Sequence, residues 1–195
     1  MDHLLNRKMT FKKYGFQVVK NFLEPHFVEF IQQYFFLRIK AGHSILGDEQ
    51  APNSYSFYGD PLMETILDSS TESLSKISEF NLLPTYSYSR LYGMGDELVI
   101  HKDRPSCEIS ATISLGVPNN DISPIYFSQN EDKSNPIKIL LEPGDLCLYR
   151  GCDLYHWREP FNQKWYLQSF LHYVNADGEY KDHIYDKRNY LGIQK

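Results

Sequence analysis

The chain has 195 residues, a hydrophobic fraction of 42%, an aromatic fraction of 15% and a formal net charge of −5. This length favours one domain with a sizeable core. The acidic average argues against a nucleic-acid partner, although it leaves room for a local basic groove. No segment approaches the ~18 apolar residues needed to cross a bilayer. The first residues lack the apolar run of a signal peptide, and three cysteines without a C-x-x-C motif fit a reducing compartment. We therefore expect a cytoplasmic protein with no membrane partner.

The first third of the chain shows helical patterns. Residues 15–19 are expected to form a short strand, and residues 25–42 a helix with Pro25 in its first turn. A second helix is predicted to begin after Asp60, an N-cap residue followed by proline. The polar and aromatic segment 43–57 is expected to form a loop over a pocket mouth. The apolar positions of the first helix that recur at helical spacing are Phe27, Phe30, Ile31, Tyr34, Phe35 and Ile39.

After Pro84 the apolar period changes to two, which is typical of strands. Short strands at this spacing predict a sandwich or an open barrel. We expect one domain over 1–195, with a helical support over roughly 1–83, a β core over roughly 84–175 and a tail over 176–195 whose fold is not readable. The predicted strands cover residues 85–91, 97–101, 108–115, 124–127, 138–141, 146–149 and 165–174.

His101 and Asp103 stand at the end of an apolar strand, and His156 follows a later strand and the break at Gly151. Because residues i and i+2 of a strand share a face, His101 and Asp103 can point at one metal ion. Two imidazoles and one carboxylate are the facial triad of non-haem Fe(II), which leaves positions open for a co-substrate and O₂. A His-x-Asp tripeptide by itself is more often a surface ion pair, so the surrounding sequence must decide.

Four landmarks in the surrounding sequence occur in a recognisable order. They are the strand and glycine turn at 88–96, the His101-Lys102-Asp103 motif, the Pro-Gly-Asp turn and strand at 142–149, and the segment 156–161, where a proline follows the histidine by four residues. In this order they resemble the iron(II)/2-oxoglutarate-dependent dioxygenases, specifically the prolyl 4-hydroxylase-like branch. The resemblance covers roughly residues 84–175, with a looser echo in residues 15–23.

The resemblance implies a mainly β protein with flanking N-terminal helices, built as a double-stranded β-helix or jelly roll. It implies Fe(II) bound by His101, Asp103 and His156, with 2-oxoglutarate as co-substrate, O₂ as oxidant and ascorbate as a reductant. The implied reaction is hydroxylation of an unactivated C–H bond, with succinate and CO₂ as co-products. The branch suggests a prolyl residue of a peptide or protein as substrate, while small molecules, free amino acids and nucleic-acid bases stay open.

The far carboxylate of 2-oxoglutarate needs a cation. The family usually supplies it about ten residues after the last histidine, at the start of the final strand; here Lys164 comes eight residues after and is our first candidate. Arg158, which shares a strand face with His156, is the competitor, and Arg104 is a third cation. Tyr92 or Tyr88 could donate an O–H to the co-substrate.

Other features carry alternatives. Arg104 and Glu108 flank the metal motif and are candidates for substrate contact, and Gln168 and His172 share a strand face that is expected to line the barrel. Two rival functions stay open: a cupin-like metal-dependent hydrolase or isomerase, and a non-catalytic jelly-roll binding module. The oligomeric state is not readable from the sequence.

Overall fold

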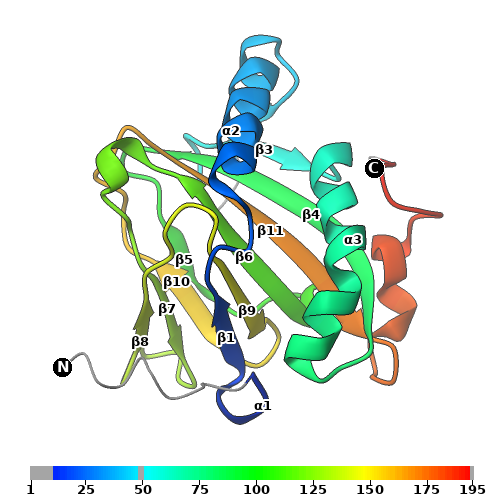
Figure 1. Cartoon of the computed structure of the whole chain (residues 1–195). Helices are drawn as coiled ribbons and strands as arrows, with labels where there is room; N and C mark the ends of the chain where they lie inside the picture. Colours follow the sequence, from blue (N-terminus) through cyan, green and yellow to red (C-terminus); the bar gives the residue numbers. More distant parts are fainter. Residues whose placement is uncertain (1–10, 48–50, 194–195) are drawn as a thin grey trace.

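The computed structural model describes residues 11–47 and 51–193, and antiparallel strands dominate it (Figure 1). The strands are β1 Phe16–Val19, β2 Ile45–Leu46, β3 Tyr55–Tyr58, β4 Leu82–Gly93, β5 Leu98–His101, β6 Ile109–Gly116, β7 Ile125–Ser128, β8 Ile137–Ile139, β9 Leu146–Arg150, β10 Tyr155–Arg158 and β11 Trp165–Asn175.

The strands form two sheets. Among the described residues, the larger sheet has the order β1-β9-β6-β11-β4-β3-β2 and the smaller one the order β5-β10-β7-β8. From β4 onward the chain passes repeatedly from one sheet to the other, so that strands distant in sequence become neighbours. This winding is a double-stranded β-helix, and it confirms the predicted fold class.

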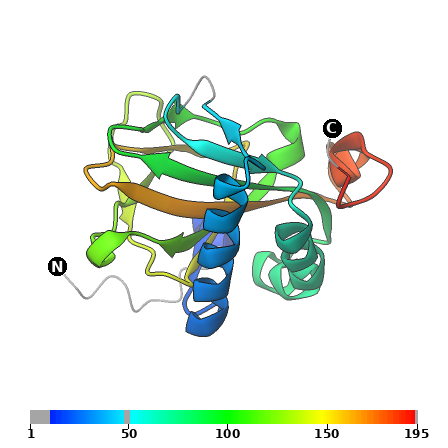
Figure 2. The same ribbon diagram turned by 90° about the horizontal axis from the view of Figure 1, so that it is seen from above.

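In the described part of the chain, three helices precede this core: α1 Phe11–Tyr14, α2 Pro25–Lys40 and α3 Pro61–Ser78. As Figure 2 shows, α2 and α3 lie on the same side of the larger sheet. Pro25 begins α2 as predicted, and the Asp60 carboxylate caps α3 by accepting from the backbone N–H groups of Leu62 at 3.0 Å and Met63 at 3.3 Å. The two longer helices therefore begin where the sequence indicates, while α1 was not predicted.

The main hydrophobic core lies between these helices and the larger sheet. Ile31 and Phe35 of α2 belong to this core, together with Ile109, Ala111 and Ile113 of β6. The alternate β6 residues Ser110, Thr112 and Ser114 are also fully buried, on the face toward the smaller sheet. The polar stripe of this strand therefore faces the interior of the barrel rather than solvent.

The apolar stripe of α2 differs in part from the one expected. Ile31 and Phe35 are buried as predicted, and Tyr34 and Ile39 are partly buried against the core. Phe27 is 38% exposed and Phe30 is 55% exposed, and their rings stack on each other at the surface, while Val28 is buried. Because apolar residues occur around most of this helix, the sequence does not reveal which face packs against the sheet.

Two predicted features need correction. The segment 43–57 is not a plain loop, because β2 and β3 extend the larger sheet and β3 pairs with β4. His156 lies inside a strand, β10, that was not predicted, because its buried residues include the polar His156 and Arg158. The short strand predicted in the first third of the chain forms as β1 and pairs with β9.

The tail packs beside β4 and the 3₁₀ turn Pro105–Cys107 (Figure 1). It contains the 3₁₀ segment Lys181–Lys187. Arg188 pairs with Glu64 of α3 at 2.6 Å, and both side chains are almost fully buried. This buried ion pair connects the tail to α3.

Among the described residues, no helix combines the length and the apolar character that crossing a membrane requires.

Candidate metal centre

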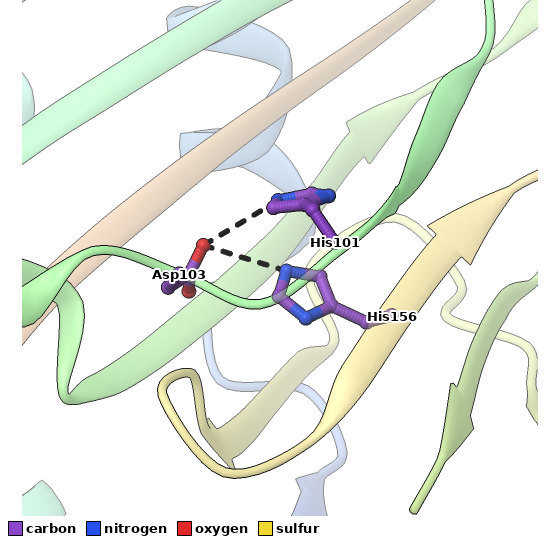
Figure 3. Close-up of side chains that lie close together, drawn as sticks. All are labelled: His101, Asp103 and His156. Carbon is purple, nitrogen blue, oxygen red and sulfur yellow. Dashed lines mark ion pairs between the residues drawn. The ribbon is translucent and has the colours of Figure 1, made fainter. Parts of the chain in front are cut away.

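Three side chains converge on one point, two from the smaller sheet and one from the loop that follows β5 (Figure 3). His101 ends β5 and is the direct cross-strand partner of His156 in β10. Their ring centroids are 4.3 Å apart. Asp103 lies just after β5, where its N–H donates to the Gly151 carbonyl at 2.9 Å. The structure therefore brings together the three residues that the sequence analysis singled out.

The imidazole nitrogens face the carboxylate in a symmetric way. The Nε2 atoms of His101 and His156 each lie 3.5 Å from Asp103 Oδ1. The Nδ1 atoms contact backbone carbonyls two residues earlier, Val99 O at 2.7 Å and Leu154 O at 3.0 Å. A neutral imidazole that donates through Nδ1–H presents its Nε2 lone pair, which is the form that binds a metal ion.

The charges at this point favour an ionised carboxylate. Burial alone would raise the pKa of Asp103, but the charge of His156 and hydrogen bonds from both histidines outweigh it and hold that pKa well below its usual range. Burial likewise acts to lower the pKa of His101, and the hydrogen bonds to Asp103 and Val99 O raise it instead. A divalent cation bound at this point would supply the positive charge that stabilises the Asp103 carboxylate.

Two further residues fix the carboxylate. Ser110 Oγ donates to Asp103 Oδ2 at 2.8 Å and lies 2.9 Å from His172 Nδ1. A Cβ on Gly151 would lie 2.3 Å from both Asp103 Oδ2 and the Cys107 carbonyl oxygen, so a side chain cannot fit there without displacing the carboxylate. Neither role was predicted from the sequence: the alternation of β6 hints at Ser110, whereas Gly151 indicates only a break between strands.

A second group of potential ligands, Asp103, Cys107 and His172, also lies within 4.8 Å. Burial raises the pKa of the Cys107 thiol well above its usual value and lowers the pKa of His172 to about 4. Cys107 Sγ contacts Tyr86 Oη at 3.0 Å, and His172 Nδ1 is engaged by Ser110. We therefore interpret Cys107 and His172 as residues that surround and position Asp103, and not as a second metal site.

The triad opens into a cavity of about 360 Å³. Tyr88, Tyr92 and Arg104 line it, as the sequence analysis anticipated for a co-substrate or substrate pocket. Arg90 also lines it and was missed; its guanidinium lies 5.2 Å from the Tyr88 ring centroid and 5.4 Å from that of Tyr92. The signal was available, because Arg90 shares the strand parity of these two tyrosines.

Three predicted residues, Lys164, Glu108 and Arg158, are not among those that line this cavity. Lys164 is exposed in the bend before β11, and the side chain that enters the interior from that strand is Tyr166. Glu108 accepts from the Asn175 N–H at 2.8 Å, on the side of the tail. Arg104 does line it, but its guanidinium also binds Asp186 at 2.8 and 3.0 Å.

Arg158 is 1% exposed and points into the barrel. Its Nη1 donates to Ser123 O at 2.9 Å, and its guanidinium lies 5.4 Å from the Tyr166 ring centroid. Its Nε and Nη2 have no hydrogen-bond partner among the described residues. Buried polar atoms in native proteins normally have partners, so such a group marks a place for a bound polar ligand or water.

Other unpaired polar atoms lie on the interior face of the larger sheet. Tyr92 pairs across the strands with Tyr166, and Gln168 pairs with Ser114, which places these side chains on one face. Within the described part of the chain, Tyr92 Oη, Thr112 Oγ1 and both amide atoms of Gln168 are buried without a partner. Together with Arg158 they give the barrel interior donors and a cation suited to a carboxylate.

Comparison with known proteins adds the fold family. No family model and no curated protein matches the sequence. Solved structures do match: a prolyl hydroxylase from Trichoplax adhaerens, in complex with a peptide fragment of the hypoxia inducible factor oxygen degradation domain, has a TM-score of 0.69 and 16% identity over 91% of this chain and 90% of that chain. The chain has the jelly-roll fold of the 2-oxoglutarate-dependent oxygenases.

Two more structures with this oxygenase fold are similar. A prolyl-4-hydroxylase from Pseudomonas putida has a TM-score of 0.64 and 16% identity over 83% of this chain and 94% of that chain. HygX from Streptomyces hygroscopicus, with nickel and 2-oxoglutarate bound, has a TM-score of 0.64 and 14% identity over 86% of this chain and 85% of that chain. At these identities the likeness establishes the oxygenase fold, and the chemistry has to be argued from the site.

Proposed function

We propose that the protein is an Fe(II)- and 2-oxoglutarate-dependent oxygenase that hydroxylates an unactivated C–H bond. The observation that carries this proposal is the convergence of two imidazole nitrogens and one carboxylate at the wall of a cavity that aromatic and polar side chains line. Such a set binds one face of Fe(II) and leaves the other face open. When bound, iron would supply the redox chemistry with 2-oxoglutarate and O₂, giving succinate and CO₂ as co-products.

The protein's own contribution is to bind and orient. Ser110 and Gly151 hold the Asp103 carboxylate in place, and the two backbone carbonyls hold the imidazole rings. We assign the far carboxylate of 2-oxoglutarate to Arg158 rather than to Lys164. Arg158 lies two residues from His156, about 6.6 Å along a strand, a spacing comparable to the length of a five-carbon diacid.

The finer assignment, a prolyl residue of a peptide as substrate, also belongs to this proposal. Two of the similar structures are prolyl hydroxylases, and one of them holds a peptide. The cavity wall includes Tyr86, Tyr88, Tyr149 and Phe170, and aromatic-lined grooves are a recurrent way of binding proline-containing segments. Small molecules with an aliphatic C–H bond are the alternative.

Removal of the carboxylate tests the proposal. Asp103→Ala removes one of three metal ligands, and we expect Fe(II)-dependent release of succinate from 2-oxoglutarate to fall below detection. The matched control is Asp177→Ala, which changes an exposed carboxylate in the turn after β11. Unchanged succinate release in Asp103→Ala would contradict the proposal.

The same assay separates the rival functions. A cupin-like hydrolase or isomerase would show activity with Zn²⁺ or Mn²⁺ and no need for 2-oxoglutarate. A binding module would fail to take up Fe(II) under anaerobic conditions. Within the described residues the triad contains two imidazoles and no third, which favours the oxygenase.

A further inference from the structure

A second hollow, of about 400 Å³, adjoins the candidate metal centre and has a cationic lining. Lys12, Lys13, Lys102 and Arg150 line it, against a single carboxylate, that of Asp153. The whole chain carries a formal net charge of −5, so this concentration of positive charge runs against the average. A concave surface lined by one sign of charge focuses the electric field and raises the local concentration of counter-ions.

Lys102 connects this hollow to the cavity at the metal centre. Its side chain lines both, and it stands between His101 and Asp103 in the chain. Its ammonium lies 4.6 Å from the Tyr155 ring centroid. The three proposed metal ligands all line the first cavity, and none of them lines the second hollow.

Arg150, at the end of β9, gives the hollow a fixed guanidinium. This group lies 5.7 Å from the Phe11 ring centroid and 5.3 Å from that of Phe80. Its Nε is buried and has no hydrogen-bond partner among the described residues. Its contact with Asp153 is 3.6 Å long and the Asp153 side chain is 62% exposed, so this ion pair competes weakly with an incoming anion.

The lysines of α1 complete the lining from the other side. Lys12 and Lys13 are exposed, and the Lys12 contact with Glu79 is a surface pair at 3.6 Å. Lysine ammonium groups bind phosphate and carboxylate as point charges, while an arginine adds a planar donor pair. The four cations therefore suit an oxyanion that enters from solvent.

We propose that this hollow anchors a carboxylate or phosphate group of the substrate. The substrate class is then an anion whose charged group lies away from the carbon that is hydroxylated. This inference rests on the proposed function and deepens it. 2-Oxoglutarate itself is assigned elsewhere, since it must reach the metal and Arg158 inside the barrel.

Anion binding can be measured without knowing the substrate. The full chain is loaded anaerobically with Fe(II) and saturating 2-oxoglutarate and titrated calorimetrically with inorganic phosphate and, separately, with an acetylated triglutamate peptide. We expect at least one probe to bind, and the double variant Lys12→Gln/Lys13→Gln to weaken it tenfold or more. Lys40→Gln/Lys138→Gln removes the same charge from exposed positions elsewhere and should leave the affinity unchanged.

A second variant protects against a trivial loss of fold. Arg150→Gln should weaken the same probe while circular dichroism and Fe(II) binding stay those of the unsubstituted protein. Equal probe affinity in the two double variants, or binding of neither probe, would overturn the anion site. Failure of the unsubstituted protein to bind Fe(II) or 2-oxoglutarate would instead overturn the proposed function.

Turnover tests whether the anion belongs to the substrate. Carboxylated, phosphorylated and uncharged amino acids and peptides are screened for stimulated succinate release. We expect the stimulating compounds to be anions, and their KM to rise tenfold or more in Lys12→Gln/Lys13→Gln with kcat and the KM for 2-oxoglutarate within twofold. Stimulation by uncharged compounds alone would overturn the inference.

Discussion

At the scale of single residues, the candidate metal centre depends on how its ligands are held. Each histidine is fixed by a carbonyl two residues earlier, and Asp103 is fixed by Ser110 and by its own N–H. Groups that orient metal ligands typically contribute tenfold to a hundredfold to metal affinity. The positions around the triad are therefore as informative to substitute as the triad itself.

Gly151→Ala tests whether the close approach of the Gly151 backbone to Asp103 holds the carboxylate in place. The added Cβ would lie 2.3 Å from Asp103 Oδ2, so the carboxylate has to move, and we expect Fe(II) affinity to fall tenfold or more. Overpacking of this kind also costs about 1–3 kcal/mol of stability. Gly93→Ala is the control, because its Cβ would meet its nearest atom at an ordinary 3.4 Å. Equal Fe(II) affinity in both variants would contradict the assigned role of Gly151.

The two arginines of the barrel can be distinguished by the KM for 2-oxoglutarate. Arg158→Gln removes the buried cation with unpaired Nε and Nη2, and we expect that KM to rise tenfold or more. Arg90→Gln removes the cation that lies between tyrosine rings at the cavity wall, and should act mainly on the substrate. A raised KM for 2-oxoglutarate in Arg90→Gln alone would transfer the anchoring role to Arg90.

At the scale of elements, alternation along one strand creates the site. β6 directs Ile109, Ala111 and Ile113 toward the helices and Ser110 and Thr112 toward the barrel interior. Both faces are buried, so the polar face cannot be recognised as interior from its composition. It faces the candidate metal centre because β10 and β5 bring His156 and His101 over it.

The start of α3 offers a prediction that separates stability from chemistry. Asp60 is fully buried, caps α3 and pairs with Arg38 of α2. Asp60→Ala removes the cap and leaves Arg38 without its carboxylate, which should cost about 2 kcal/mol or more in urea denaturation. Fe(II) affinity should not change. Glu72→Ala, which breaks an exposed ion pair with Lys76, should leave the urea midpoint almost unchanged.

At the scale of the whole molecule, the tail supports one wall of the cavity by binding Arg104, which lines it. Asp186 accepts from Tyr58 Oη at 2.6 Å and from Arg104, whose guanidinium lies 4.6 Å from the Tyr86 ring centroid. Tyr185, Asp186 and Lys187 all adopt left-handed backbone angles, with φ of 53°, 54° and 61°. Such a run is unfavourable for non-glycine residues and persists here because its contacts with the core compensate.

Substitution of the buried Glu64–Arg188 ion pair tests how much the contacts between the tail and the core stabilise the fold. Glu64→Leu leaves the arginine charge buried and unpaired, and we expect unfolding free energy to fall by about 3–5 kcal/mol. The double variant Glu64→Leu/Arg188→Met removes both charges and should regain most of the loss. A double variant no more stable than Glu64→Leu, measured by urea denaturation, would show that the tail is held by other contacts.

The sequence by itself predicted most of the barrel strands, the starts of α2 and α3 and the three residues that converge at the candidate metal centre. A period of two, a cap and a His-x-Asp spacing are local features of neighbouring residues, whereas His156 was found by its place in an ordered set of landmarks. The strand β10 was not predicted because its buried residues include the polar His156 and Arg158. Lys164 was preferred to Arg158 because spacing along the chain does not reveal which side chain is buried.

Only the tertiary structure decided what surrounds the triad. The role of Gly151, the Arg158 Nε and Nη2 atoms without a partner among the described residues, and the cationic hollow shared by α1, β9 and Lys102 all arise from segments distant in sequence. Their proximity depends on strand register and on how the two sheets face each other. A single sequence carries no local pattern for contacts of this kind, because each partner is compatible with many neighbours until the fold selects one.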